Sequence, residues 1–536
     1  MVTLTALTQN ELDTLSERVP GGAANIADIY PLAPLQESIF LVHSATEKSD
    51  PYVTTITLEF DSETQIDRFV ARFNQIIARY DVLRTMVAWR ECQAPLQVVL
   101  RHCELLPTWL SFSGQTDARA KLDAYVAEGI HRMDLELAPL VQLELAHDPA
   151  TDTYCGVLKE HHILLDHISV EMIMGELAMD EQTFAQLPDA LPYRQFIAQT
   201  LHNAEQLDSR KYFTDQLGDI ETPCHPFGLD STRADDLYCN ELHRELSQQQ
   251  SSQIRTLMQQ RGMSPAAFFH LAWAMVVSAC SQSRDVVFGT VLSGRMSGQQ
   301  GIEQMMGMMI NTLPLRVNLA DEAADTLLQQ VDQALLGLMP YEQASLTEAQ
   351  ACSGVSAQTP LFSAIFNYRH SRLAEAPAQG GAQAIAAKER TNYPFNLCVD
   401  DWGKAFSFNL QVDSSVDINA IDEYVTCAIE QLLRALNDES DTPVAKLSVL
   451  NEAQQDALMR ANVSHAVDTD TTSSIQARFE SQAAKFGERT ALVYQQESLT
   501  YRELNARANA LAHYLIEAHD IRPDTLVGLC VGRGST

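Results

Sequence analysis

Positive charge is scarce in this chain of 536 residues, which carries 37 Lys and Arg against 70 Asp and Glu, a net charge of −33. The acidic residues are spread along the chain rather than gathered in a tail. Nucleic acids and anionic membrane surfaces bind proteins through clustered basic residues. The sequence therefore argues against both as partners, and we expect no nucleic acid and no membrane to bind.

Long apolar runs and paired cysteines are also missing. The most apolar long window, residues 264–280, is shorter and more interrupted than a membrane-spanning helix. Ser264 followed by Pro265 is typical of the start of a buried core helix. The first residues lack the basic and apolar stretches of a signal peptide. The ten cysteines show no CxxC spacing, which favours reduced thiols in a cytoplasmic protein over a disulfide framework or a zinc site.

Strand-like and helix-like segments alternate irregularly along the chain, as in a mixed α/β protein. Residues 54–61 predict a strand, and residues 62–80 predict an amphipathic helix whose apolar side chains share one face. The length predicts about two to four domains. Composition divides the chain loosely near residue 190. Residues 451–475 are polar and predict a linker, and an incomplete new unit follows over residues 476–536.

The stretch EHHILLDH, residues 160–167, contains two adjacent histidines followed by an aspartate. Adjacent side chains on a strand point to opposite faces, so His161 and His162 cannot both face one metal without a bend. Because no further ligand cluster accompanies them, we predict no metal site.

Two interpretations of the histidines stay open from the residues alone. Both histidines are core residues, or one faces a cleft as an acid–base group while its neighbour packs behind it. In the second case Asp166 pairs with an arginine from elsewhere in the chain. No GxSxG nucleophile motif accompanies the histidines, which indicates direct transfer between two bound substrates rather than a covalent acyl-enzyme.

The residues around this stretch resemble the condensation domain of nonribosomal peptide synthetases, over residues 29–450. Seven stretches match the family's core motifs in order: IYPLAPLQESIF (29–40), RYDVLRT (79–85), EHHILLDH (160–167), LPYRQF (191–196), DVVFGTVLSGR (285–295), MMINTLPLRV (308–317) and YEQASLTEAQACSGV (341–355). The third departs from the family's HHxxxDG only at its last position, where His167 replaces glycine. Residues 499–515, LTYRELNARANALAHYL, resemble the first core motif of an adenylation domain.

The resemblance implies an α/β fold like that of chloramphenicol acetyltransferase. Two lobes, residues 1–190 and 191–450, would form a V-shaped pseudo-dimer with a central tunnel. The implied reaction joins a donor acyl or peptidyl thioester to the amine of an acceptor aminoacyl thioester. Both substrates would be held on the phosphopantetheine arms of partner carrier proteins, so we expect no cofactor bound covalently to this chain. The remainder of the adenylation domain is expected in the same synthetase.

The resemblance also assigns roles by position. His162 becomes the catalytic histidine, acting as a base or as the group that positions the amine and stabilises the tetrahedral intermediate. Asp166 is expected to be structural and to pair with Arg79 or Arg84, while His161 packs behind His162. Four further residues are expected to line the tunnel or contact substrate: Ser38, His43, Ser293 and Asn367.

Several stretches look most like the dual epimerisation/condensation branch of the family. That branch is associated with an extended motif of two histidines and a later Gly-Asp, just after the first core motif. Here the segment reads VHSATEKSD, in which Val42 replaces the first histidine, His43 remains and Ser49 replaces the glycine. Because epimerisation removes an α-proton and returns it on the other face, we predict that this activity is weakened or lost.

His167 leaves two interpretations open. It is a helix N-terminal residue tolerated at this position, or it is a second catalytic acid–base group. The second would suit a related clade that acts on modified residues and removes water from a donor serine or threonine, since that reaction needs several proton transfers. Ser38, where branch members usually have glycine, is compatible with this clade. An alternative function of another class is that of a catalytically silent domain that recruits partners. The intact His162 and Asp166 argue against it.

Overall fold

The computed structural model describes most of the chain. The described residues are 4–46, 50–90, 92–111, 118–128, 131–149, 152–230, 239–295, 301–319, 321–370, 383–388, 391–438, 441–462 and 473–530. The chain forms two compact units, Met1–Asn451 and Glu452–Thr536. Each unit is described by itself.

The first lobe of the larger unit is built on a five-stranded sheet with the order β12-β2-β7-β6-β5. Its strands are β2 (Val53–Phe60), β5 (Thr108–Trp109), β6 (Val141–Asp148), β7 (Thr153–His161) and β12 (Gln383–Lys388). All neighbours are antiparallel except β5 and β6. A smaller three-stranded sheet of β1 (Ile26–Pro31), β4 (Leu96–Leu100) and β3 (Thr85–Ala88) completes the lobe.

Helix α3 (Glu63–Arg79) shows how the sequence dictates this lobe. Ser62 caps the helix by accepting a hydrogen bond from the Gln65 amide, and the predicted apolar face, including Phe69 and Phe73, is buried in the first core. The predicted strand and helix over residues 54–80 are therefore confirmed to within a residue at each end. The other helices of the lobe are α1 (Gln9–Arg18), α2 (Pro34–Ala45), α4 (Ala118–Glu128), α5 (His167–Leu177) and α6 (Glu181–Ala185).

The second lobe is built on a six-stranded mixed sheet with the order β10-β9-β11-β13-β14-β8. Its strands are β8 (Cys239–Glu245), β9 (Asp285–Leu292), β10 (Asn311–Asn318), β11 (Ala364–His370), β13 (Phe395–Asp401) and β14 (Phe406–Asp413). Strand β11 runs parallel to β9 and β13, and the other neighbours are antiparallel. The remaining helices are α7 (Arg194–Gln206), α8 (Ser209–Leu217), α9 (Gln248–Arg261), α10 (Pro265–Ser281), α11 (Ala324–Leu338), α12 (Leu346–Ala351) and α13 (Ile418–Asn437).

The two faces of this second sheet differ. Alternate side chains such as Phe366, Leu397 and Phe408 are buried in the core that also contains the apolar residues of α10 and α13. Neighbouring positions on the same strands carry amides, among them Asn367 and Asn409, and these line a cavity on the other face. A sheet that buries one face and turns a polar face toward a cavity is suited to holding a substrate between the lobes.

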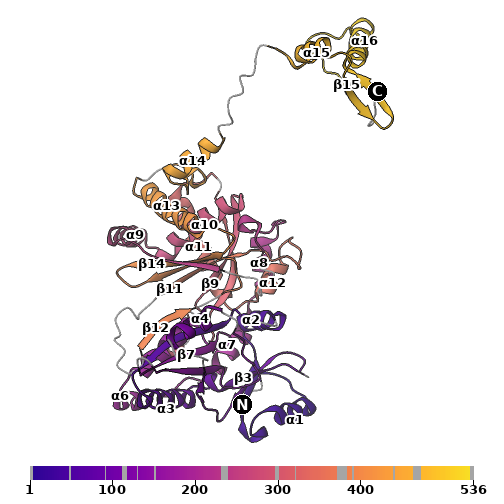
Figure 1. The fold of residues 1–536 in the computed structure, drawn as a ribbon. Coiled ribbons are helices and arrows are strands. Elements are labelled where there is room, and N and C mark those ends of the chain that lie inside the picture. The colour runs from indigo at the N-terminus through magenta and orange to yellow at the C-terminus, as the bar shows by residue number, and fades with distance from the viewer. Residues whose placement is uncertain are drawn as a thin grey trace. The chain divides into compact units, whose positions relative to one another are not determined.

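Segments of the second half of the chain also enter the first lobe. Strand β12, drawn in orange in Figure 1, pairs with β2 of the first lobe. Met305 and Met309 belong to the first lobe's core, as do Phe196 and Ile197 of α7. The first core therefore extends past residue 190, and the lobes are tied together by exchanged segments as well as by side-chain contacts.

The smaller unit contains α14 (Glu452–Asn462), α15 (Ile475–Lys485), β15 (Thr490–Tyr494), β16 (Glu497–Thr500) and α16 (Tyr501–His519). The stretch that resembles the first adenylation motif forms the end of β16 and the following helix, which Thr500 caps together with Glu503. Apolar side chains of α16 such as Leu511 and Tyr514 are each 59% exposed. Part of the predicted linker, residues 463–472, lies outside the described residues.

Among the described helices, none is by itself long and apolar enough to cross a membrane. Helices α9 and α10 have sufficient length and apolar composition only when taken together, and a bend of 113° separates them. Most of α10 is buried in the second core, where Phe268, Trp273 and Val276 are fully enclosed. The prediction of a buried core helix over residues 264–280 is confirmed.

Candidate active site

The double histidine lies where β7 ends and the chain turns toward α5. The His161 amide donates to the Leu140 carbonyl (3.1 Å), and the His162 amide donates to the Tyr52 carbonyl (2.8 Å). Asp166 then caps α5, since its carboxylate accepts hydrogen bonds from the Ser169 amide (2.8 Å) and hydroxyl (2.7 Å). The turn is thus fixed at both ends, which gives its side chains defined directions.

The two histidines occupy opposite environments, as adjacent strand residues should. His161 is fully buried, whereas His162 is half-buried and lines a cavity of about 270 Å³. The His162 ring stacks on Tyr52, with centroids 6.4 Å apart and planes 21° apart. Its Nδ1 atom is buried and has no hydrogen-bond partner among the described residues. A polar group of a bound molecule could form a hydrogen bond with that nitrogen.

Asp166 is braced by an arginine of the second lobe, Arg295. The Arg295 guanidinium donates to both carboxylate oxygens (2.9 and 3.0 Å) and also to the carbonyls of Ile302 (3.1 Å) and Met305 (2.7 Å). Asp166 is fully buried and Arg295 nearly so. A carboxylate this deep must be matched in charge and in hydrogen bonds, and Arg295 supplies both.

The predicted pairing of Asp166 with Arg79 or Arg84 is wrong. Arg79 lies beside Glu176 (Nε to Oε1 3.8 Å) and donates to the Pro188 carbonyl. Arg84 donates to the carbonyls of Ile77 (3.1 Å) and Leu100. Both guanidinium groups are occupied within the first lobe, while Asp166 faces the second-lobe segment that carries Arg295. Arg295 is the last residue of the core motif DVVFGTVLSGR. The motif was therefore recognised in the sequence, but its pairing with Asp166 was not.

Three of the other candidate residues line the cavity and two do not. Ser38, His167 and Asn367 line the cavity together with His162, whereas His43 and Ser293 are not among its lining residues. His167 is the first residue of α5, and its Nε2 atom lies 3.2 Å from Glu171 Oε1. No positive φ is required at its position. Its catalytic role stays a prediction.

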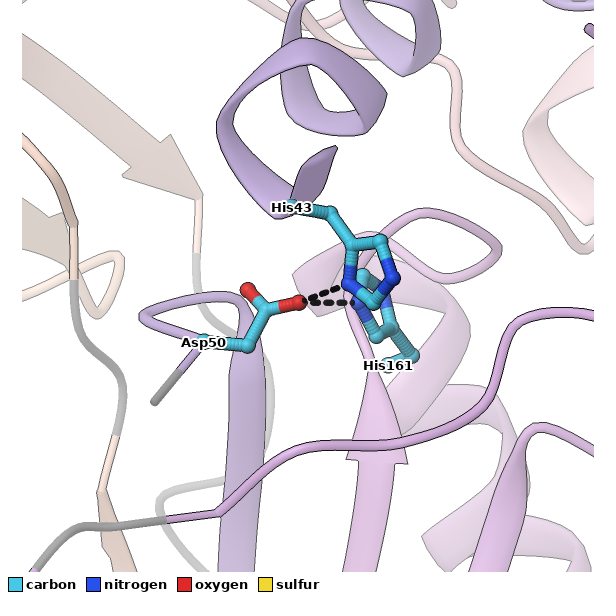
Figure 2. A group of neighbouring side chains, drawn as sticks. All are labelled: His43, Asp50 and His161. Carbon is cyan, nitrogen blue, oxygen red and sulfur yellow. Dashed lines mark hydrogen bonds and ion pairs between the residues drawn. The ribbon is translucent and has the colours of Figure 1, made fainter. Parts of the chain in front are cut away.

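His43 instead joins a buried cluster with Asp50 and His161, shown in Figure 2. Asp50 Oδ2 lies 2.5 Å from His43 Nδ1 and 2.9 Å from His161 Nε2. Within the described residues this is the group whose donor atoms lie close enough together for a metal ion. Sequence reasoning missed Asp50, although it stands at the end of the VHSATEKSD segment. The pairing of β2 with β7, which places Val53 opposite His161, brings it there.

Burial and hydrogen bonding act against each other on this cluster. Burial alone would raise the pKa of Asp50, but hydrogen bonds from His161 and His43 hold that pKa well below its usual range. Burial lowers the pKa of His161 because the interior disfavours the imidazolium. Both shifts favour an ionised carboxylate beside a neutral His161.

This geometry belongs to a known class of protein. Residues 26–459 match the condensation domain family, and residues 479–535 match the AMP-binding enzyme family. The chain therefore belongs to the condensation domains of nonribosomal peptide synthetases and continues into an AMP-binding segment, as the motifs predicted.

Two synthetases illustrate the relationship. Malpinin synthetase of Mortierella alpina is 38% identical over 99% of this chain and 7% of its own length. Bacitracin synthase 3 of Bacillus licheniformis is 28% identical over 97% of this chain and 8% of its own length. The chain thus spans less than about a tenth of these relatives.

Solved structures support the fold. A four-domain nonribosomal peptide synthetase bound to AMP and glycine superposes with a TM-score of 0.66 at 14% identity, over 92% of this chain and 39% of that one. The condensation domain of a monacolin K polyketide synthase gives 0.62 at 18% identity, over 79% of this chain and all of that one. The predicted chloramphenicol acetyltransferase-like α/β fold is confirmed.

Proposed function

We propose that the larger unit forms an amide bond between a donor acyl or peptidyl thioester and the α-amine of an acceptor aminoacyl thioester. Both substrates would arrive on the phosphopantetheine arms of separate carrier proteins. The observation that carries this proposal is the position of His162, which is fixed by the backbone and faces a cavity lined from both lobes. The family relationship supports the same chemistry.

The reaction requires one proton transfer that a histidine can assist. The acceptor nitrogen attacks the thioester carbon and forms the C–N bond, and the C–S bond breaks. The proton lost by the nitrogen ends on the departing sulfur, which leaves as a thiol. A neutral His162 can accept a hydrogen bond or the proton from the attacking amine, since a neutral imidazole has one nitrogen with a free lone pair. Asp166 and Arg295 hold the turn and do not touch the reacting atoms.

Epimerisation of the donor would be weakened or lost in such a domain. Val42 stands where the epimerising branch carries the first histidine of its extended motif, and Val42 lines the cavity beside His162. An isopropyl group cannot exchange a proton. The histidine that remains, His43, donates to Asp50 in the interior and does not line the cavity.

A second candidate function is favoured by His167. This side chain lines the same cavity as His162 and Ser38, so two imidazoles flank the space available to substrate. Loss of water from a donor serine or threonine removes an α-proton and protonates the departing β-oxygen, which two acid–base groups could share. Amide formation remains the first proposal, because it needs only His162.

One reconstitution separates these activities. The full chain is incubated with donor and acceptor carrier proteins loaded with defined L-aminoacyl groups, including seryl and threonyl donors. The masses of the carrier-bound products are then measured by mass spectrometry. We expect a product with the summed mass of the two residues and an unchanged L-donor. A product lighter by one water would establish dehydration, and a D-residue would show that epimerisation is retained. Absence of any amide product from every donor and acceptor pair would contradict the proposed function.

A further inference from the structure

The members of the cluster His43, Asp50 and His161 are not among the residues that line the cavity, and the cluster has no role in the reaction described above. His43 comes from α2, His161 ends β7, and Asp50 precedes β2. Their side chains are essentially removed from solvent, at 4%, 0% and 0% exposure for His43, Asp50 and His161. Figure 2 shows both rings directed at one carboxylate oxygen. Such a buried anion needs a structural or functional reason.

The hydrogen bonds fix where the protons lie. The Ile163 amide donates to His161 Nδ1 (3.1 Å), so that nitrogen is an acceptor and the proton is on Nε2, facing Asp50. Arg132 Nη2 lies 3.2 Å from His43 Nε2, and a guanidinium can only donate, so His43 carries its proton on Nδ1, also facing Asp50. Two neutral imidazoles therefore donate to one ionised carboxylate.

This arrangement disfavours a metal ion. Zinc bonds to nitrogen and oxygen are about 2.0–2.2 Å long, and the ligands must direct lone pairs at the ion. Here both ring nitrogens direct protons at Asp50, and the cationic Arg132 already lies against His43. Asp50 and Arg132 balance each other in charge. The cluster is better described as a hydrogen-bonded support than as a metal site.

The cluster is hydrogen-bonded to Tyr52. Asp50 Oδ1 accepts a hydrogen bond from the Tyr52 amide (2.9 Å), and the Tyr52 carbonyl accepts one from the His162 amide (2.8 Å). The Tyr52 ring stacks on the His162 ring, and the Tyr52 hydroxyl donates to Asn392 Oδ1 (2.7 Å). Tyr52 and Asn392 both line the cavity. One tyrosine thus joins the buried cluster, His162 and a segment of the second lobe.

We propose that Tyr52 is the positioning residue for His162, and that the His43–Asp50–His161 cluster holds Tyr52 in place. His162 Nδ1 has no protein partner among the described residues, so no hydrogen bond there orients the ring. The stacked phenol and the Tyr52 carbonyl are what define its plane and its main-chain position. The catalytic consequence, though not the geometry, rests on the proposed role of His162.

The test separates ring stacking from the hydroxyl bond. Full-length protein with ¹³C-labelled histidine is studied by NMR, with His162 assigned from a His162→Gln variant. Tyr52→Leu removes the ring, while Tyr52→Phe and Asn392→Ala remove only the link to the second lobe. We expect Tyr52→Leu to shift the His162 ring resonance, and Tyr52→Phe and Asn392→Ala to leave it close to the parent's.

Kinetics provide the second readout. With carriers loaded by the synthetase's own adenylation domains, Tyr52→Leu should lower kcat at least tenfold with little change in KM, and Tyr52→Phe should lower it less than threefold. An unchanged His162 resonance in folded Tyr52→Leu protein would overturn the proposal. A changed resonance in a protein whose parent forms no amide would instead overturn the proposed function and leave the positioning role standing. One equivalent of bound zinc, lost in Asp50→Asn, would overturn the hydrogen-bonded assignment of the cluster.

Discussion

His162 is held from two sides by buried contacts of different kinds. After it in the chain, Asp166 meets Arg295 in a charged pair that joins the first lobe to the second, with Arg295 Nη2 donating to both carboxylate oxygens. Before it, His161 meets Asp50 in a cluster where the side-chain donors to the carboxylate are neutral rings and all members belong to the first lobe. The first contact sets the position of the turn relative to the opposite wall. The second sets the ring environment of His162 through Tyr52.

The difference predicts unequal sensitivity to mutation. Removing one partner of a buried ion pair leaves a charge with no compensation, whereas removing one charge from a neutral-donor cluster leaves unmatched polar hydrogens. The first loss should be larger and should affect the junction between the lobes. The second should be smaller and should affect catalysis through Tyr52 more than it affects stability.

The largest expected effect is that of Arg295→Met, which keeps the aliphatic stem but removes the charge facing Asp166. Loss of a buried pair costs about 3–5 kcal/mol, so the free energy of unfolding should fall by about that amount. Urea unfolding followed by tryptophan fluorescence measures it. Arg84→Met is the matched control, since the Arg84 guanidinium donates to carbonyl oxygens, and its loss should cost about 1–2 kcal/mol. Equal losses in the two variants would remove the distinction.

A smaller effect is expected from Asp50→Asn. An amide oxygen in the place of Oδ2 can accept both ring protons, but the amide NH₂ then opposes the Tyr52 amide, so one hydrogen bond is lost at a cost of about 1–3 kcal/mol. The same unfolding measurement applies, with the exposed Asp61→Asn as control and an expected change within about 0.5 kcal/mol. A more stable Asp50→Asn protein would show that the carboxylate is not held as described.

The smallest expected effect is on the pH dependence of the free energy of unfolding, to which His161 of the buried cluster contributes. Because the pKa of His161 is lowered in the folded state, the unfolded chain binds a proton first as pH falls below about 6.5, and stability declines with acidification. This contribution is at most about 1.4 kcal/mol per pH unit. His161→Gln keeps a donor for Asp50 but cannot titrate.

Unfolding free energies at pH 7.5, 6.5 and 5.5 should therefore fall less steeply in His161→Gln than in the parent. His270, whose pKa burial lowers to about 4, contributes its own decline equally to both proteins and cancels in the comparison. Parallel pH profiles for parent and variant would mean that His161 is not buried in the neutral form.

The same comparison shows what sequence reasoning could and could not reach. Period-two and period-3.6 patterns place β2 and α3 correctly because each element's burial is local to it. The separation of His162 from His161 follows from strand alternation alone. The identity of Arg295 does not, because it lies 129 positions from Asp166 and any arginine of the core motifs was equally suitable by charge.

Asp50 was missed for a similar reason. Its proximity to His161 depends on the register of β2 against β7, and register is set by the whole sheet. The polar face of the second sheet likewise depends on strand order, since β9, β11, β13 and β14 are adjacent in space but not all in sequence. The motifs identified residues on each side of the cavity, but only the fold shows which of these residues contact one another.

The most direct test of the role of His162 compares His162→Ala with His167→Ala in single-turnover amide formation on loaded carrier proteins. If His162 assists the proton transfer, its loss should slow the reaction by about 10²–10⁴-fold. His167→Ala, on the same cavity wall, should retain amide formation within about tenfold of the parent. A His162→Ala protein that forms amide at the parent's rate would show that His162 does not assist the proton transfer.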